Sequence, residues 1–290
     1  MIEYITPQTR PQILEMWRVC FGDSQPYFDI YFREKYSDEN TLAYFEDDKV
    51  VASLQLLYYN FTFCGVEIPI AYISGACTLP EARKKGYMEA LLKRTFQELA
   101  KKNIPLSLLV PEEDWLLAFY GKYGYAQTFD AGTDLPSLEE LMKRHSDNLP
   151  AAYNEFDSWF RNQQMTVQKT FDDFRIVVEE AAGYDYQAKK SLDGMARVIN
   201  VRLLLELFAK KNPEKSFSVE ITDAILTQNN LFLAVRNGKV LDTDAKLPIH
   251  LSLSIYDLAQ ALLGYQTSKK QTLFKNIFPE HHPQMHFMME

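Results

Sequence analysis

The hydrophobic and polar positions at the start of the chain predict two helices followed by a set of strands. Apolar residues recur at helical spacing over residues 13–20, behind a threonine-proline pair at 6–7 that is typical of a helix start. A second, aromatic-rich helix is predicted over 27–36. The predicted strands are residues 41–45, 50–60, 61–68 and 70–79. We expect the first two strands to form a hairpin and the last two to bend at Gly65 and Pro69.

A long helix is predicted after Gly86, followed by a strand, a helix and a strand. Its apolar face has the spacing i, i+3, i+4, i+7, i+8 and i+11, occupied by Met88, Leu91, Leu92, Thr95, Phe96 and Leu99. Apolar runs at 106–110 and 125–129 predict strands, with a short helix at 115–123 between them. This mixture indicates an α+β fold with a mixed sheet, which we assign to a first domain of residues 1–134.

The rest of the chain divides into a polar helical stretch and a second β pattern. Residues 135–190 are predicted to form a helical connector, in which apolar residues of 170–182 share one face. Residues 191–290 are predicted to form a smaller α+β domain. Its expected strands are residues 195–201, 216–221, 230–236 and 248–254. A helix over 255–263 ends at Gly264, a residue favoured after helix C-termini.

Composition and charge argue against several classes of protein. The 290 residues include 31 Lys and Arg against 39 Asp and Glu, a net charge of −8, whereas nucleic-acid backbones require clustered positive charge. No apolar run reaches the ~20 residues of a transmembrane helix. The first residues lack the positive flank and apolar core of a secretory signal. Three cysteines without metal-ligand spacing favour a reducing compartment, so we expect a cytoplasmic protein that binds no nucleic acid.

The clearest chemical signal is a basic turn between the predicted strand 70–79 and the helix after Gly86. The turn carries three consecutive cations, Arg83, Lys84 and Lys85. A helix start offers free N–H groups and the positive end of the helix dipole, so it attracts anions such as diphosphate. Cations at this position are therefore expected when an anion binds there, and a glycine lets the ligand approach the backbone. The alternative is a solvated basic turn without a ligand.

Two motifs in this region resemble those of the GNAT N-acetyltransferases. The pattern Arg-x-x-Gly-x-Met at residues 83–88 resembles the coenzyme A diphosphate loop of that superfamily. The run Phe-Tyr-Gly-Lys-Tyr-Gly-Tyr at 119–125, about one helix and one strand later, resembles the next signature of the superfamily. The pair at this separation is more specific than either motif alone.

The resemblance extends to one branch of the superfamily. With residues 17–23 and 74–78, the N-terminal part is similar to the enhanced-intracellular-survival family, in which a bulky residue after the glycine is usual. Members of this branch carry a C-terminal sterol-carrier-protein-like domain, which residues 191–290 resemble in the order of their elements. Better-known members have a second acetyltransferase-like domain in the middle, where this chain has only the helical connector.

The resemblance implies an acetyl-CoA dependent N-acetyltransferase whose acceptor is a primary amine of a small molecule or peptide. It implies acetyl-CoA as cosubstrate, no metal, and assembly into a homo-oligomer. The implied cofactor-binding residues are Ala76, Cys77 and Thr78 along the pantetheine arm and Arg83, Lys84, Gly86, Tyr87 and Met88 at the diphosphate. Tyr120 matches the general acid that protonates the leaving thiolate, and the carboxylate of Glu290 matches a base supplied by the end of the chain.

Simpler interpretations stay open beside these roles. Tyr120 also suits an aromatic core in a chain with 17 tyrosines, and Glu290 suits a frayed terminus. The C-terminal domain also permits a non-catalytic acyl-CoA or lipid-binding protein, and a third alternative is an interaction scaffold on an inactive fold. His281, His282 and His286 lack the further ligands of a metal site, so we expect no metal.

Overall fold

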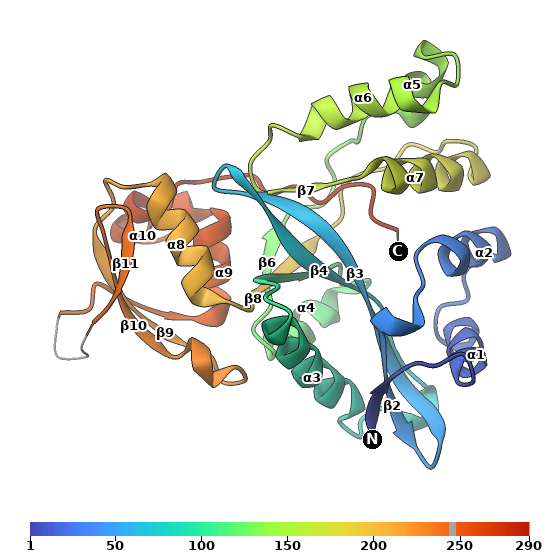
Figure 1. Ribbon diagram of the computed structural model, residues 1–290, viewed down its shortest axis with the longest axis horizontal. Coiled ribbons are helices and arrows are strands. Elements are labelled where there is room, and N and C mark those ends of the chain that lie inside the picture. The colour runs from blue at the N-terminus through green and yellow to red at the C-terminus, as the bar shows by residue number, and fades with distance from the viewer. Residues whose placement is uncertain (244–247, 290) are drawn as a thin grey trace.

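The computed structural model describes residues 1–243 and 248–289, which form two sheets flanked by helices (Figure 1). Within these ranges the larger sheet has eight strands in the order β1-β2-β3-β4-β5-β8-β6, and β7 pairs with β3 beside this row. The smaller sheet has four described strands in the order β11-β10-β9-β12. Parallel and antiparallel pairs occur in both sheets, which confirms the predicted α+β class with a mixed sheet.

The larger sheet is built around one long hairpin. β3 (Lys49–Phe63) and β4 (Val66–Thr78) pair antiparallel along their lengths and turn at Cys64-Gly65. The prediction of separate strands at 61–68 and 70–79 is therefore wrong. Pro69 lies inside β4 opposite Asn60, just before the residues of β4 that pair with β5, so its missing N–H does not interrupt the sheet. β1 (Ile2–Tyr4) and β2 (Thr41–Glu46) extend the sheet beyond β3.

Helices cover both faces of this hairpin, because alternate residues of a strand point to opposite faces. Leu57 of β3 packs in one cluster with residues of α1 (Arg10–Cys20) and α2 (Gln25–Glu34). Leu54 and Leu56 pack on the other face with α3 (Tyr87–Lys101). The predicted stripe of α3 is confirmed from Leu91 to Leu99, where its residues are buried. α1 begins at Arg10, not at the predicted 6–7, with Pro11 in its first turn.

The strand, helix and strand predicted after α3 are confirmed as β5 (Leu106–Leu109), α4 (Asp114–Gly121) and β6 (Ala126–Phe129). The strand predicted at 195–201, the first of the second β pattern, pairs with other strands than expected. β8 (Gly194–Val198) lies between β5 and β6 in the larger sheet, antiparallel to both. The assignment of 195–201 to the second sheet is therefore wrong, because the pairing partners of a strand are not encoded in its own apolar pattern. We propose that the second domain begins with α8, near residue 201.

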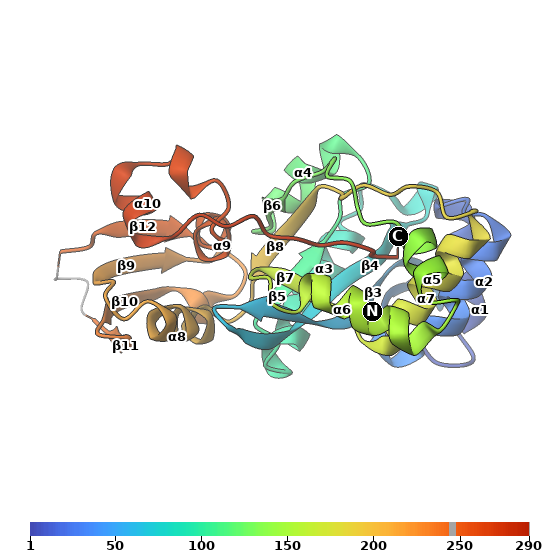
Figure 2. The same ribbon diagram turned by 90° about the horizontal axis from the view of Figure 1, so that it is seen from above.

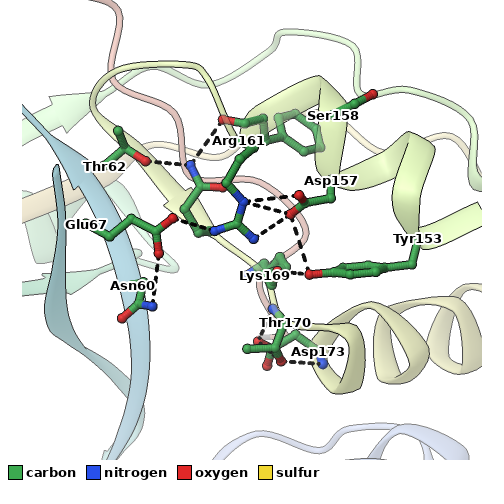
Figure 3. Close-up of polar contacts among 12 residues, drawn as sticks. Asn60, Thr62, Glu67, Tyr153, Asp157, Ser158, Arg161, Lys169, Thr170 and Asp173 are labelled. Carbon is green, nitrogen blue, oxygen red and sulfur yellow. Dashed lines mark hydrogen bonds and ion pairs between the residues drawn. The ribbon is translucent and has the colours of Figure 1, made fainter. Parts of the chain in front are cut away.

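The predicted connector is mainly helical, but it also contributes a strand to the larger sheet. Its elements are α5 (Leu138–Arg144), α6 (Leu149–Phe160), β7 (Thr166–Gln168) and α7 (Phe171–Gly183). β7 pairs antiparallel with the end of β3. Arg161, directly after α6, joins the connector to the sheet through an ion pair of 2.5 Å with Glu67 of β4, and it also pairs with Asp157 of α6 at 2.5 Å (Figure 3).

The second domain places helices against the smaller sheet (Figure 1). Its helices are α8 (Val201–Lys211), α9 (Ile255–Leu263) and α10 (Thr272–Ile277). Its strands are β9 (Phe217–Thr222), β10 (Leu231–Arg236), β11 (Lys239–Asp242) and β12 (Leu251–Ser254). The predicted end of α9 at Gly264 is confirmed by the positive φ of that residue, 69°. Rings of Phe208, Phe217 and Phe278 fill the interior between helices and sheet, with centroids 5.2 to 6.4 Å apart.

The C-terminal tail returns from the second domain to the first (Figure 2). Gln284 pairs with β7, donating its N–H to Met165 and accepting from the N–H of Val167. His286 is buried and stacks on Phe160 at a ring distance of 3.6 Å. The tail thereby joins both domains and the connector. No helix within the described residues is long and apolar enough to cross a membrane.

Candidate functional site

The site begins where two neighbouring strands of the larger sheet stop pairing. β4 and β5 run parallel and pair from Ile70 and Leu106 to Tyr72 and Leu108. β4 then continues six residues further, to Thr78, with β3 on its other edge. Its edge towards β5 therefore has no strand partner over this stretch in the part of the chain that the structure describes, and such an edge presents backbone N–H and C=O groups to a ligand.

A bulge shapes β4 inside this gap. Cys77 lies opposite Ser53 and Ser74 opposite Gln55, so Gly75 and Ala76 together lie opposite Leu54 and form a β-bulge with one extra residue in β4. Gly75 has a φ of 57°, and a Cβ atom there would lie 2.2 Å from the ring of Trp17. Only glycine satisfies both the conformation and the contact.

The basic turn follows β4 directly. A short 3₁₀ helix, Pro80–Ala82, leads into Arg83, Lys84 and Lys85, and Gly86 precedes α3 with a φ of 82°. Among the described residues, no side chain caps the start of α3, so the free N–H groups of its first turn remain available. A Cβ atom at Gly86 would meet no atom of the described residues within 4 Å, so the space beside this helix start is open to them.

The three cations of the turn have different partners. Lys85 lies 3.5 Å from the carboxylate of Glu46, which also accepts a hydrogen bond from Tyr87. Hydrogen bonding to Glu46 raises the pKa of Tyr87 to about 12, and the same bond together with Lys85 lowers the pKa of Glu46. Arg83 donates to the backbone carbonyl of Thr78 over 3.3 Å. Arg83 and Lys84 both line the cavity in front of α3, whereas Lys85 is turned to Glu46.

That cavity has a volume of about 500 Å³ and lies between the β4–α3 turn and α4. The structure places all the predicted cofactor-binding residues in its wall: Ala76, Cys77, Thr78, Arg83, Lys84, Gly86, Tyr87 and Met88. The opposite wall is mainly aromatic, with Trp115, Phe119 and Tyr123, and it also carries Glu112 and Glu113. One wall therefore offers cations and backbone N–H groups, and the other offers apolar surface, which suits an elongated ligand with an anionic part.

Tyr120 stands where this cavity meets a second one. It lies on α4 and is 7% exposed. Burial raises the pKa of its hydroxyl well above the usual value, and the nearby Cys77 and Glu112 raise it further. A second cavity of about 320 Å³ shares five lining residues with the first: Phe21, Ala76, Glu112, Leu116 and Tyr120. A donor bound in one cavity and an acceptor bound in the other would thus meet at Tyr120.

The second cavity contains residues that the sequence analysis did not assign to the site. Trp17 lines it and donates its indole N–H to the carboxylate of Asp23 over 2.6 Å. Asp23 and Glu112 are the acidic side chains among the described residues of an otherwise largely apolar wall. Residues 17–23 carried part of the family resemblance, but nothing in their spacing indicated that α1 lies against the bulge of β4. The role of Trp17 in the site depends on this tertiary contact.

The predicted base lies at the end of the chain, and Glu290 is outside the described residues. The described tail runs close to the site, because Val110 lines both the second cavity and a pocket whose wall includes residues 285–288. Burial lowers the pKa of His286 to about 3. Among the described residues, no three His, Cys, Asp or Glu side chains gather as metal ligands.

Sequence comparison identifies both domains. Residues 1–128 match the acetyltransferase (GNAT) domain family, and residues 201–278 match the sterol carrier protein domain family. The chain therefore contains a GNAT acetyltransferase domain followed by a C-terminal sterol carrier protein domain. No curated protein matches its sequence.

Solved structures share the fold over most of the chain. A GCN5-related N-acetyltransferase from Anabaena variabilis is similar with a TM-score of 0.70 and 17% identity over 98% of both chains. A conserved protein from Enterococcus faecalis, a probable N-acyltransferase, has a TM-score of 0.68 and 15% identity over 95% of this chain and 92% of its own. Eis1 from Mycobacterium abscessus has a TM-score of 0.60 and 13% identity over 91% and 90%. At these identities the likeness establishes a common fold.

Proposed function

We propose that this protein is an acetyl-CoA dependent N-acetyltransferase that transfers the acetyl group directly to a primary amine. The observation that carries the proposal is the meeting of two cavities at Tyr120, one of them lined by the basic turn. A ternary complex needs this geometry, because direct transfer requires donor carbonyl and amine to be held in contact.

The first cavity supports acetyl-CoA as donor. We propose that the diphosphate lies at the start of α3, where Arg83, Lys84 and the N–H groups after Gly86 surround open space. The pantetheine arm carries two amides, and the unpaired edge of β4 at residues 76–78 provides matching backbone groups. The thioester would then lie next to Tyr120.

The proposed reaction balances with groups that the chain supplies. The amine nitrogen forms a bond to the thioester carbonyl carbon, and the carbon–sulfur bond breaks as coenzyme A leaves as a thiolate. The Tyr120 hydroxyl is protonated at neutral pH even at the ordinary tyrosine pKa of about 10, so it is present as a hydrogen-bond donor to the departing sulfur, and burial makes it a weaker acid. Solvent restores the proton of Tyr120 after transfer. The amine loses a proton to a base. We propose that this base is the carboxylate of Glu290.

The second cavity supports an amine as acceptor. Its walls include Trp17, Phe21 and Tyr72, and the carboxylates of Asp23 and Glu112 adjoin this apolar surface. An ammonium group approaching the site is stabilised by these two negative charges before it loses a proton.

The assembly of several copies of the chain into a homo-oligomer also stays a prediction.

Thiol release tests the proposed function. The protein is given acetyl-CoA and a panel of polyamine, aminoglycoside, arylalkylamine and peptide acceptors, and free coenzyme A and acetylated product are measured by mass spectrometry. We expect turnover with at least one amine and a loss of kcat of about 100-fold or more in Tyr120→Phe. Tyr58→Phe is the matched control, because this hydroxyl contacts Lys102 at the far end of α3. No turnover with any amine, or equal kcat in Tyr120→Phe, would contradict the proposal.

Removal of residues 287–290 tests the proposed base. We expect a fall in kcat that is largest at low pH, where less of the amine is already neutral. Unchanged turnover in the shortened chain would exclude a role of the tail in the reaction.

A further inference from the structure

A fully buried cation lies between the two domains and outside both cavities. Arg197 of β8 has an exposed fraction of 0%. Removing a guanidinium from water is costly unless its charge and its N–H groups are all compensated. The partners of Arg197 therefore show what this position requires.

Arg197 joins three parts of the chain. Its Nη2 donates to both carboxylate oxygens of Asp223, over 2.9 and 3.1 Å, and its Nη1 donates to the carbonyl of Val198 over 2.7 Å. Its Nε donates to the backbone carbonyl of Tyr123 over 2.7 Å. Asp223 directly follows β9 of the second domain. Arg197 thus connects the second domain to the turn after α4.

Asp223 is itself held in place within the second domain. Its carboxylate accepts from the backbone N–H groups of Ile225 and Leu226 and from the side-chain amide of Asn229. The side chains of Asp223 and Arg197 are 1% and 0% exposed. The pair is therefore rigid on its second-domain side, and a movement of β9 would be passed to Arg197.

The turn on the other side carries Tyr120. The carbonyl of Tyr120 accepts from the N–H of Tyr123 over 2.9 Å and from that of Tyr125 over 3.3 Å, which closes residues 120–125 into one compact turn. The second domain also contacts this turn at Gly124, where a Cβ atom would lie 2.6 Å from Ile255 of α9. Arg197 and Ile255 hold the turn from one side while the Tyr120 ring faces the cavities on the other.

We propose that Arg197 and Asp223 are positioning residues for Tyr120, so that the second domain sets the geometry of acetyl transfer. The inference rests on the proposed function for its kinetic consequence. A buried ion pair adds little to stability compared with apolar residues of similar size, whereas its directional hydrogen bonds fix the carbonyl of Tyr123. Acetyl-CoA binding depends on the β4–α3 turn, which neither residue contacts, so loss of the pair affects kcat more than KM.

The double variant Arg197→Met/Asp223→Asn tests this role, because it leaves no buried charge unpaired, and the amide oxygen that replaces the carboxylate can still accept from the N–H groups of Ile225 and Leu226. We expect a folded protein whose kcat falls by about 10- to 100-fold, while the KM for acetyl-CoA changes less than about twofold. Val235→Ala, in the buried core of β10, is the control for a general weakening of the second domain, and its kcat should equal that of wild type. Wild-type kcat in the double variant would overturn the proposal.

Amide hydrogen exchange provides a readout that does not depend on turnover. In the double variant we expect faster exchange of the amides of Tyr123 and Tyr125, with unchanged protection of β9 and β10. Unchanged protection of the turn would overturn the positioning role, even in a protein that shows no acetyl transfer. If the wild-type protein has no turnover but the turn loses protection in the double variant, the proposed function fails, and the role of Arg197 and Asp223 in holding the turn is retained. If the double variant does not fold, Asp223→Asn, which keeps the size of the side chain, is measured in the same two ways.

Discussion

Both domains place helices against a mixed sheet. They differ within the described residues, because neighbouring strands separate and leave cavities between them in the first domain. In the first domain β4 and β5 part after Tyr72 and Leu108, and two cavities occupy the gap. In the second domain the corresponding interior is filled by the rings of Phe208, Phe217 and Phe278. The comparison teaches that an α+β layer offers cavities where strand pairing ends early, whereas aromatic rings fill the interior of the second domain.

This contrast bears on the alternative of a lipid-binding protein. A container for an acyl chain needs an apolar space between helices and sheet, and the described core of the second domain is occupied by its own aromatic side chains. The contacts through Arg197 and Ile255 give that domain a different use, as a support for the turn that carries Tyr120.

The largest expected effect is a difference in the free energy of unfolding between substitutions in the filled interior of the second domain and in the cavity wall of the first. Phe278→Ala removes a fully buried ring and should lower the free energy of unfolding by about 3–5 kcal/mol in urea. Phe21→Ala, at a half-buried ring that lines both cavities, should cost only about 1 kcal/mol. Equal losses for the two variants would contradict the proposed difference in packing.

The next effect concerns the bulge that shapes the opening. Gly75→Ala places a methyl group against Trp17 at a positive φ and should lower the free energy of unfolding by about 2–4 kcal/mol. Gly22→Ala is the matched control, since its φ is also positive, 67°, but its surroundings are open within 4 Å. The control should cost about 1 kcal/mol. If both variants lose the same free energy in urea, the Trp17 contact does not determine the residue at this position.

A pH effect tests the tail that joins the two domains. Burial lowers the pKa of His286 to about 3, so the unfolded chain takes up a proton below about pH 6.5 and the folded protein does not. Stability is therefore lost as the pH falls from 6.5 towards 3, by about 2 kcal/mol at pH 5. Unfolding in urea at pH 7 and pH 5, compared with His286→Phe, isolates this contribution, because the variant keeps the stacking on Phe160. An equal pH dependence in both proteins would show that the tail opens in solution.

The smallest expected effect is a difference in the KM for acetyl-CoA between substitutions of two lysines in the basic turn, Lys84 and Lys85. Lys84→Gln should raise the KM for acetyl-CoA about five- to tenfold, because it removes one charged partner of the diphosphate. Lys85→Gln should raise it about twofold or less, since Lys85 is paired with Glu46. Steady-state kinetics at fixed ionic strength measure both variants. A larger effect at Lys85 would place the diphosphate on the other side of the turn.

The sequence by itself determined the features that depend on short stretches of chain. The stripe of α3, the glycine before it and the cations beside it follow from helical periodicity and from the chemistry of a helix start. The end of α9 at Gly264 follows from the same kind of local rule. These features could be predicted because the residues that cause them are neighbours.

Only the tertiary structure decided which distant segments meet. The insertion of β8 between β5 and β6, the contact of Trp17 with the bulge at Gly75, and the bridge from Asp223 to the Tyr120 turn each join residues far apart in the chain. An apolar strand can pair with several partners, and a buried arginine has no local pattern that marks its acceptor. These contacts result from the packing of the whole chain, which is why the site and its support were incomplete until the fold was known.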